Sequence, residues 1–142
     1  MSHQVRVLFV CTGNSARSQM AEAFARHIGA GKVEAASAGI DPKGLHPLTV
    51  KVMAEKGIDV SYQASKALTD EILRKADYVV TVCGHADERC PALPSHVHKL
   101  HWPIDDPAIL SGRAPEEVLA GYRRARDELE SRVREFLSTL EC

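Results

Sequence analysis

A cysteine at position 11 begins the segment of this chain best suited to chemistry. Cys11 follows an apolar run at residues 5–10, broken only by Arg6, which predicts a central buried strand, and precedes a run with helical spacing. The N–H groups at a helix N-terminus lack partners and carry partial positive charge, so a loop there can bind a tetrahedral anion. The loop residues predicted to bind an oxyanion are Thr12, Gly13, Asn14, Ser15, Ala16, Arg17 and Ser18.

Three residues of this loop have predicted chemical roles. Arg17 carries a planar guanidinium that can bond two oxygens of one anion. The dipoles that attract the anion also favour a thiolate, which makes Cys11 the predicted nucleophile. Ser18 is placed to donate a hydrogen bond to that thiolate. The alternatives are that Cys11 is a small buried hydrophobic residue and that Ser18 only caps the helix.

Two further cysteines are predicted to act after Cys11. Cys83 ends a predicted strand at residues 78–82, so it should lie at the same edge of the sheet, and Cys90 follows after a polar stretch. If residues 85–89 are helical, the Cα atoms of Cys83 and Cys90 lie roughly 10 Å apart, whereas a disulfide needs roughly 4.4–6.8 Å. Disulfide formation would therefore unwind this segment. Read singly, Cys83 could be a buried strand end and Cys90 a bystander, as we expect for Cys142.

The remaining pattern predicts an α/β fold. Apolar runs predict strands at residues 5–10, 33–38, 78–82 and 97–102, and helical spacing predicts helices after Cys11, at 47–56, after Thr69 and from Pro115. Alternating strands and helices indicate a mostly parallel sheet, here of four strands, flanked by helices on both faces. The length and the absence of a linker indicate one domain over residues 1–142.

Composition limits the partners and the compartment. The net charge of −1 gives no strong attraction to nucleic acid or membrane, and no apolar run is long enough to span a bilayer. The N-terminus lacks the features of a signal peptide. We therefore expect a cytoplasmic monomer whose four cysteines are thiols in the resting state.

The sequence resembles a known family in three places. Residues 10–22, Val-Cys-Thr-Gly-Asn-Ser-Ala-Arg-Ser-Gln-Met-Ala-Glu, are similar to the signature of low-molecular-weight tyrosine phosphatases and their arsenate reductase relatives. Ser37-Ala38-Gly39 and Asp105-Asp106-Pro107 extend the resemblance. It implies a four-stranded parallel sheet flanked by helices, and it makes Asp106 the general acid for the leaving oxygen.

Cys83 and Cys90 make the sequence resemble the thioredoxin-coupled arsenate reductases in particular. The resemblance implies that Cys11 forms an adduct with arsenate, that Cys83 attacks Cys11 and releases arsenite, and that Cys90 attacks Cys83. Thioredoxin then reduces the Cys83–Cys90 disulfide, with no bound cofactor. Phosphate and sulfate should compete with arsenate for the loop, because they are also tetrahedral oxyanions.

Two other functions remain open at this point. One is a small phosphatase whose extra cysteines protect Cys11 from oxidation, and the other is a non-catalytic oxyanion sensor. Phosphatase relatives usually have aromatic residues after the Asp-Pro pair, whereas Ala108 and Ile109 stand here. This difference favours a small inorganic substrate over a tyrosine phosphate.

We expect no metal site. The cysteines and histidines between residues 83 and 101 lack the tight spacing of zinc ligands. Some reductase relatives hold potassium near the loop, and Asn14, Glu22 and Ser37 match three of its ligands. Lys66 stands where those relatives have an aspartate, so its ammonium should replace the ion and remove any dependence on potassium. Ala16 also differs from relatives that carry a cysteine there.

Overall fold

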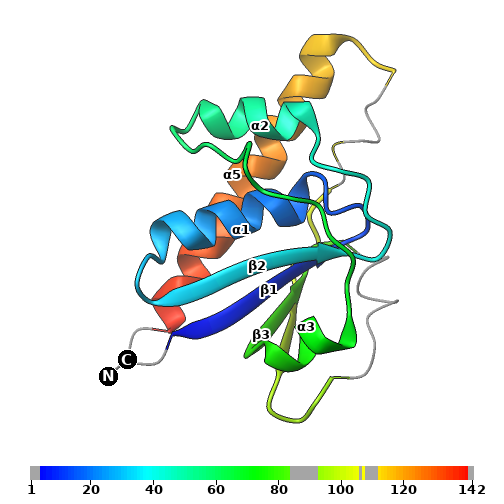
Figure 1. Cartoon of the computed structure of the whole chain (residues 1–142). Helices are drawn as coiled ribbons and strands as arrows, with labels where there is room; N and C mark the ends of the chain where they lie inside the picture. The colour runs from blue at the N-terminus through cyan, green and yellow to red at the C-terminus, as the bar shows by residue number, and fades with distance from the viewer. Residues whose placement is uncertain (1–3, 84–92, 106, 108–111, 141–142) are drawn as a thin grey trace.

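The protein forms a four-stranded parallel sheet (Figure 1). The computed structural model describes residues 4–83, 93–105, 107 and 112–140. The strands are β1 (Val5–Cys11), β2 (Val33–Gly39), β3 (Tyr78–Thr81) and β4 (His98–His101), in the order β2-β1-β3-β4. This arrangement confirms the four-stranded parallel sheet expected from the sequence.

β1 is central because its side chains are apolar on both faces. Val7, Leu8, Phe9 and Val10 are all buried, as a strand covered on both sides requires. Cys11 pairs with Gly39 on β2, and Val10 pairs with Thr81 on β3. The three strands therefore end together, and the residues that follow them meet at the carboxyl edge of the sheet, where α/β proteins bind ligands.

Helices cover both faces of this sheet (Figure 1). On one side lie α1 (Arg17–Ile28), α2 (Pro47–Ala54) and the long α5 (Pro115–Thr139), and on the other lies α3 (Asp70–Lys75). Thr69 caps α3, because its Oγ1 accepts a hydrogen bond from the Ile72 N–H at 3.2 Å. The helix predicted at residues 85–89 lies outside the described residues.

α5 packs against α1 through apolar side chains that recur every three or four residues. Its buried side chains include Tyr122, Leu129, Val133 and Phe136. The Phe136 ring meets those of Tyr78 and Trp102 edge to face, with centroids 5.2 and 6.0 Å apart. These contacts join the last helix to the start of β3 and to the residue that follows β4.

An ion-pair cluster fastens α5 to the end of α2. Glu55 accepts hydrogen bonds from Arg123 and Arg126, with Oε–N distances of 2.6 to 3.0 Å. The guanidinium of Arg123, followed by that of Arg126, lowers the pKa of Glu55 to about 2.

α2 ends at Ala54, two residues before the predicted end. Gly57 follows with φ +78°, a conformation that suits glycine.

Within the described residues, no helix has the length and apolar character needed to cross a bilayer.

The β4 strand is shorter than predicted, covering residues 98–101 in place of 97–102. Val97 instead closes a turn, with its N–H donating to Pro94 O at 3.0 Å.

Candidate active site: an oxyanion loop at the edge of the sheet

The loop after β1 is held in place by surrounding residues, which donate hydrogen bonds to its backbone carbonyl oxygens. Each carbonyl oxygen from Cys11 to Ser15 accepts at least one hydrogen bond from another segment, so these oxygens point away from the centre of the loop. The N–H groups of the same peptides therefore face the opposite way, toward the space where an anion would be bound. The donors, at 2.8 to 3.2 Å, are Ile40 N to Cys11, Asp41 N to Thr12, Lys43 N and Ser65 Oγ to Gly13, Gln19 Nε2 to Asn14, and His46 N and Thr49 Oγ1 to Ser15.

Asn14 is the turning point of the loop. It is fully buried and has φ +47°, in the left-handed region that asparagine tolerates better than most residues. Its Oδ1 accepts from the Lys66 N–H at 2.8 Å. Because a backbone N–H can only donate, this contact fixes the amide orientation and directs Nδ2 toward Ser18 Oγ, 2.7 Å away.

Cys11 is buried and lies among hydrogen-bond donors. Its Sγ accepts from the Asn14 N–H at 3.2 Å and lies 2.9 Å from Ser18 Oγ. Since Asn14 Nδ2 already donates to Ser18 Oγ, the Ser18 hydroxyl proton is free to point at the sulfur. When Cys11 is a thiolate, two donors therefore stabilise its charge, and α1 begins beside it without a side-chain cap.

Gly39 allows the loop to pack on the end of β2. A Cβ at this position would lie 2.7 Å from Thr12 O and 2.9 Å from the Asn14 backbone N. No larger residue fits without moving the loop. This close approach accounts for the glycine of the Ser37-Ala38-Gly39 segment.

Arg17 is the first residue of α1, and its side chain is largely buried at 9% exposure. Its Nη1 donates to Ile104 O at 3.0 Å, which ties the guanidinium to the segment after β4. The arrangement joins the loop to the region just before Asp105.

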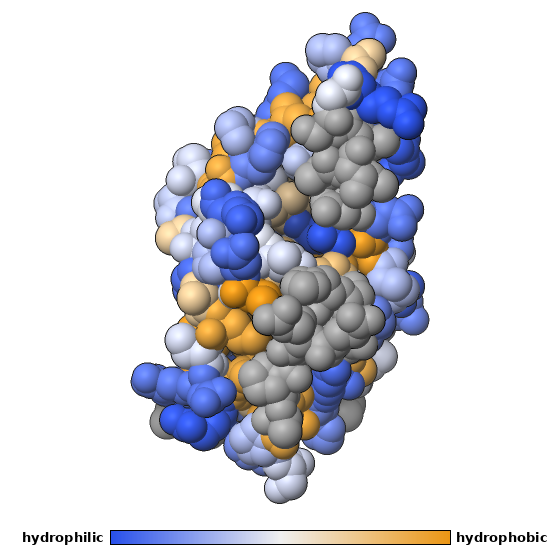
Figure 2. Space-filling model, turned by 90° about the vertical axis from the view of Figure 1, so that its right-hand side faces the viewer, coloured by the Kyte–Doolittle hydropathy of each residue, from blue (hydrophilic) through white to orange (hydrophobic). Residues whose placement is uncertain are grey.

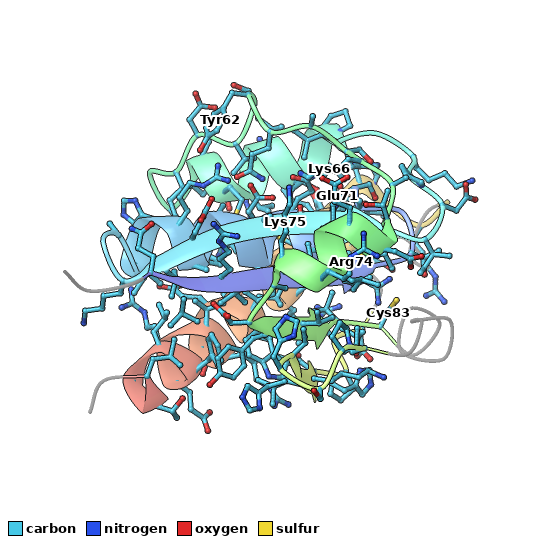
Figure 3. All side chains as sticks on the ribbon, turned by 60° about the horizontal axis from the view of Figure 1, so that its bottom comes forward. Tyr62, Lys66, Glu71, Arg74, Lys75 and Cys83 are labelled. Carbon is cyan, nitrogen blue, oxygen red and sulfur yellow. The ribbon has the colours of Figure 1, made fainter. Side chains whose placement is uncertain are left out.

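Cys83 lies beside the loop, as its place in the sequence predicts. It follows β3, which is the neighbour of β1, and its Sγ is 3.3 Å from Thr12 Oγ1. Figure 3 shows Cys83 at the carboxyl edge, beyond the end of β3. Cys11 and Cys83 are both buried free thiols, and the residue after the first contacts the second. The role of Thr12 in holding Cys83 was not foreseen from the sequence.

Several residues predicted for the site lie outside the part of the chain that the structure describes. Cys90 and Asp106 lie outside the described residues, as do Ala108, Ile109 and Cys142. Asp105 is within the described residues and is exposed.

Figure 2 looks onto the edge of the sheet that carries the loop. The coloured surface on this face includes both strongly hydrophilic and hydrophobic parts.

The potassium ligands of some relatives are already occupied here. Ser37 Oγ donates to Glu22 Oε1 at 2.6 Å, and the Arg26 guanidinium pairs with Glu22 Oε2. Arg26 also donates to Ala35 O at 3.1 Å. These groups do not fit a potassium ion, because the carboxylate has a resident cation. Among the described residues, no cluster of three or more histidine, cysteine or acidic side chains could hold a metal.

The predicted source of that positive charge was wrong. Lys66 contributes its backbone N–H to Asn14, and its side chain is exposed. Arg26 supplies the charge in its place. The signal was present in the sequence, since Glu22 and Arg26 are four residues apart on a predicted helix, a spacing that brings side chains together.

Comparisons with known proteins agree with this geometry. Residues 6–142 match the family described as low molecular weight phosphotyrosine protein phosphatase. The arsenate reductases of Halalkalibacterium halodurans and Bacillus subtilis are each 47% identical over 133 residues, which cover 94% of this chain and 95% of theirs.

Solved structures of both functional kinds resemble the chain. A thioredoxin-dependent arsenate reductase of Corynebacterium glutamicum is 33% identical with a TM-score of 0.79, covering 99% of this chain, which spans 63% of that one. The arginine phosphatase YwlE of Geobacillus stearothermophilus is 31% identical with a TM-score of 0.79, covering 96% of this chain and 93% of its own. A third is an arsenate reductase in its phosphate binding state, 31% identical with a TM-score of 0.75, covering 97% of this chain and all of that one.

Proposed function

Because this chain belongs to the low molecular weight phosphotyrosine protein phosphatase family and, within it, to the arsenate reductases, we propose that it reduces arsenate to arsenite. The observation that carries the proposal is the contact between Thr12 and Cys83, which puts a second thiol beside the loop of the first. Ester hydrolysis needs only Cys11 and water, whereas reduction needs a thiol that can reach the Cys11 sulfur.

In the first step, arsenate binds in the loop. The inward N–H groups and the Arg17 guanidinium neutralise its oxygens, and the Cys11 thiolate attacks arsenic. One oxygen leaves as water after protonation, for which Asp106 is the proposed acid. Phosphate and sulfate would occupy the same loop as competitors.

In the second step, the Cys83 thiolate attacks the Cys11 sulfur. An S–S bond forms as the S–As bond breaks, and its electron pair stays with arsenic, which departs as arsenite. Cys90 then attacks Cys83, forming the Cys83–Cys90 disulfide and returning Cys11 as a thiolate. A dithiol donor, proposed to be thioredoxin, reduces this disulfide, so the cycle suits a compartment that keeps thiols reduced, such as the cytoplasm.

The test is arsenite release with thioredoxin, thioredoxin reductase and NADPH. We expect steady turnover that stops when thioredoxin is omitted and is abolished in Cys11→Ser. NADPH oxidation without arsenite, or arsenite formation without any thiol donor, would contradict the proposal. The Cys142→Ser variant should turn over like the parent.

A phosphatase is the second candidate, and the likeness to YwlE in fold and identity favours it. The same loop can bind phosphate, with water replacing Cys83 as the second nucleophile. Hydrolysis of an aryl phosphate or of phosphoarginine without any reductant, faster than arsenate reduction at equal substrate concentration, would favour this second function over the first.

A further inference from the structure

Lys43 lies against the oxyanion loop, although no sequence motif pointed to this residue. Its N–H donates to Gly13 O at 2.8 Å, which places its backbone beside the loop. Its side chain also crosses Gly13, since a Cβ built on that glycine would lie 3.2 Å from Lys43 Cγ and 3.6 Å from Lys43 Cβ. Gly13 is partly exposed, so the Lys43 side chain runs along the outer rim of the loop.

The ammonium group at the end of this side chain has a weakly held partner. Lys43 Nζ pairs with Asp41 Oδ2 at 2.8 Å, and the two side chains are 65% and 66% exposed. Lys43 keeps the pKa of Asp41 below its ordinary value, so the carboxylate is charged at neutral pH. Ion pairs this exposed contribute little to stability, and the ammonium can therefore change partners at small cost.

We propose that Lys43 is an additional oxyanion-binding residue, which leaves Asp41 to bind the outward-facing oxygen of an anion held in the loop. A tetrahedral anion directs some of its oxygens at the loop N–H groups and at least one away from them. A doubly charged anion attracts the ammonium more strongly than a single carboxylate does. Asp41 thereby acts as a competitor that sets how tightly the loop binds its anion.

This inference rests on the proposed function only in assuming that the loop binds a tetrahedral oxyanion. Its test therefore uses inorganic phosphate and needs no turnover. Phosphate in the loop should protect Cys11 from alkylation by iodoacetamide, and mass spectrometry of the Cys11 peptide gives the concentration for half protection. A failed arsenate assay would leave this measurement unaffected.

The two partners should shift phosphate affinity in opposite directions. Lys43→Met keeps the aliphatic contact with Gly13 but removes the charge, and should weaken affinity about three- to fivefold at low ionic strength. Asp41→Asn should strengthen it about twofold. Both effects should shrink in 0.5 M sodium chloride because salt screens exposed charges. Lys43→Arg keeps the charge and should stay within about twofold of the parent.

The double variant separates partner exchange from a general change in surface charge. If Lys43 moves from Asp41 to the anion, Asp41→Asn should have a smaller effect in the Lys43→Met background than in the parent. Additive effects would mean that each charge acts independently, and they would overturn the proposal, as would unchanged affinity in both single variants.

The chain offers a matched control pair on α3. Lys75 and Glu71 form an ion pair of 3.0 Å with side chains 64% and 70% exposed, and both are labelled in Figure 3. Lys75→Met and Glu71→Gln should leave phosphate protection unchanged. If they shift it as much as the Lys43 and Asp41 variants do, the effect is not specific to the rim of the loop and the proposal fails.

Discussion

Asn14 Nδ2 donates to Ser18 Oγ at 2.7 Å, and this contact leaves the Ser18 hydroxyl proton available to the Cys11 sulfur 2.9 Å away. The Lys66 N–H on Asn14 Oδ1 prevents the amide from turning over. The nucleophile is therefore oriented by two side chains in series, Ser18 and Asn14, and by a backbone N–H from a distant segment.

Replacing Asn14 by aspartate tests this series of hydrogen bonds with almost no change in side-chain shape. An aspartate cannot donate to Ser18, so the hydroxyl proton should turn toward the new carboxylate and away from Cys11. A hydrogen bond to a charged group contributes about 1.5–3 kcal/mol, so alkylation of Cys11 at neutral pH should slow at least about tenfold. Ser18→Ala should slow it similarly, and the double variant should be no worse than either. Parent-like alkylation in Asn14→Asp would exclude the proposed orientation.

Thr12→Val should affect the second chemical step and spare the first. Valine keeps the shape of threonine but loses the hydroxyl that contacts Cys83 at 3.3 Å. One hydrogen bond contributes about 0.5–1.5 kcal/mol, which predicts arsenite release slower by about two- to tenfold. Single-turnover kinetics would measure this rate, with hydrolysis of an aryl phosphate reporting the first step. Thr12→Ser keeps the hydroxyl and should restore the rate; equal slowing of both reactions would place the defect in the loop itself.

Gly39→Ala should distort the oxyanion loop, because the loop packs on this glycine at the end of β2. The added methyl would lie 2.7 Å from Thr12 O, so the loop must shift, at a cost of about 1–3 kcal/mol in the free energy of unfolding. Phosphate should then no longer protect Cys11 from alkylation at concentrations that protect the parent. Gly44→Ala is the comparison, because its φ of +91° makes alanine strained there while no atom lies within 4 Å. That variant should lose stability but keep phosphate protection.

Arg26 predicts the response to potassium. Because its guanidinium already neutralises the buried Glu22 carboxylate, replacing sodium by potassium at constant ionic strength should change neither activity nor melting temperature. Arg26→Met would leave a nearly buried carboxylate unpaired and should destabilise the fold by about 2–3 kcal/mol, below the usual range for a fully buried pair because Arg26 is itself 43% exposed.

The control for this variant is Arg134→Met, which removes an exposed guanidinium from Glu130 at the same four-residue spacing but leaves Lys56 paired with that carboxylate. It should cost less than about 1 kcal/mol. A potassium-dependent melting temperature in the parent protein would show that Arg26 does not fill the role of the ion.

The fold and the edge at which the thiols lie could be read from the sequence because they depend on the strands being parallel. Parallel strands end at one edge, so the cysteine that ends β1 and the one that follows β3 were expected there, whereas the order that makes β1 and β3 neighbours came from the structure. Helical spacing likewise predicted the helix from Pro115 that α5 forms. Strand and helix ends were displaced by one or two residues, since propensity does not fix exactly where a ladder or a helix stops.

The parts that sequence patterns missed depend on contacts between distant segments. Residues 40–46 hold the carbonyl groups of the loop through their backbone N–H groups, which any residue type other than proline supplies. The choice of Arg26 over Lys66 depends on which side chain reaches Glu22. The Lys43 side chain lies over Gly13 only because its N–H is bonded to that residue.

A single-turnover measurement with Cys90→Ser gives the sharpest test of the three-thiol relay. Without the third thiol, Cys83 can still attack the arsenic adduct on Cys11, so we predict a burst of about one arsenite per enzyme, followed by a stalled protein with a Cys11–Cys83 disulfide. Peptide mapping under non-reducing conditions would identify that bond. Continued arsenite production with thioredoxin in Cys90→Ser, or a burst that persists when Cys83 is also replaced by serine, would contradict the three-thiol relay.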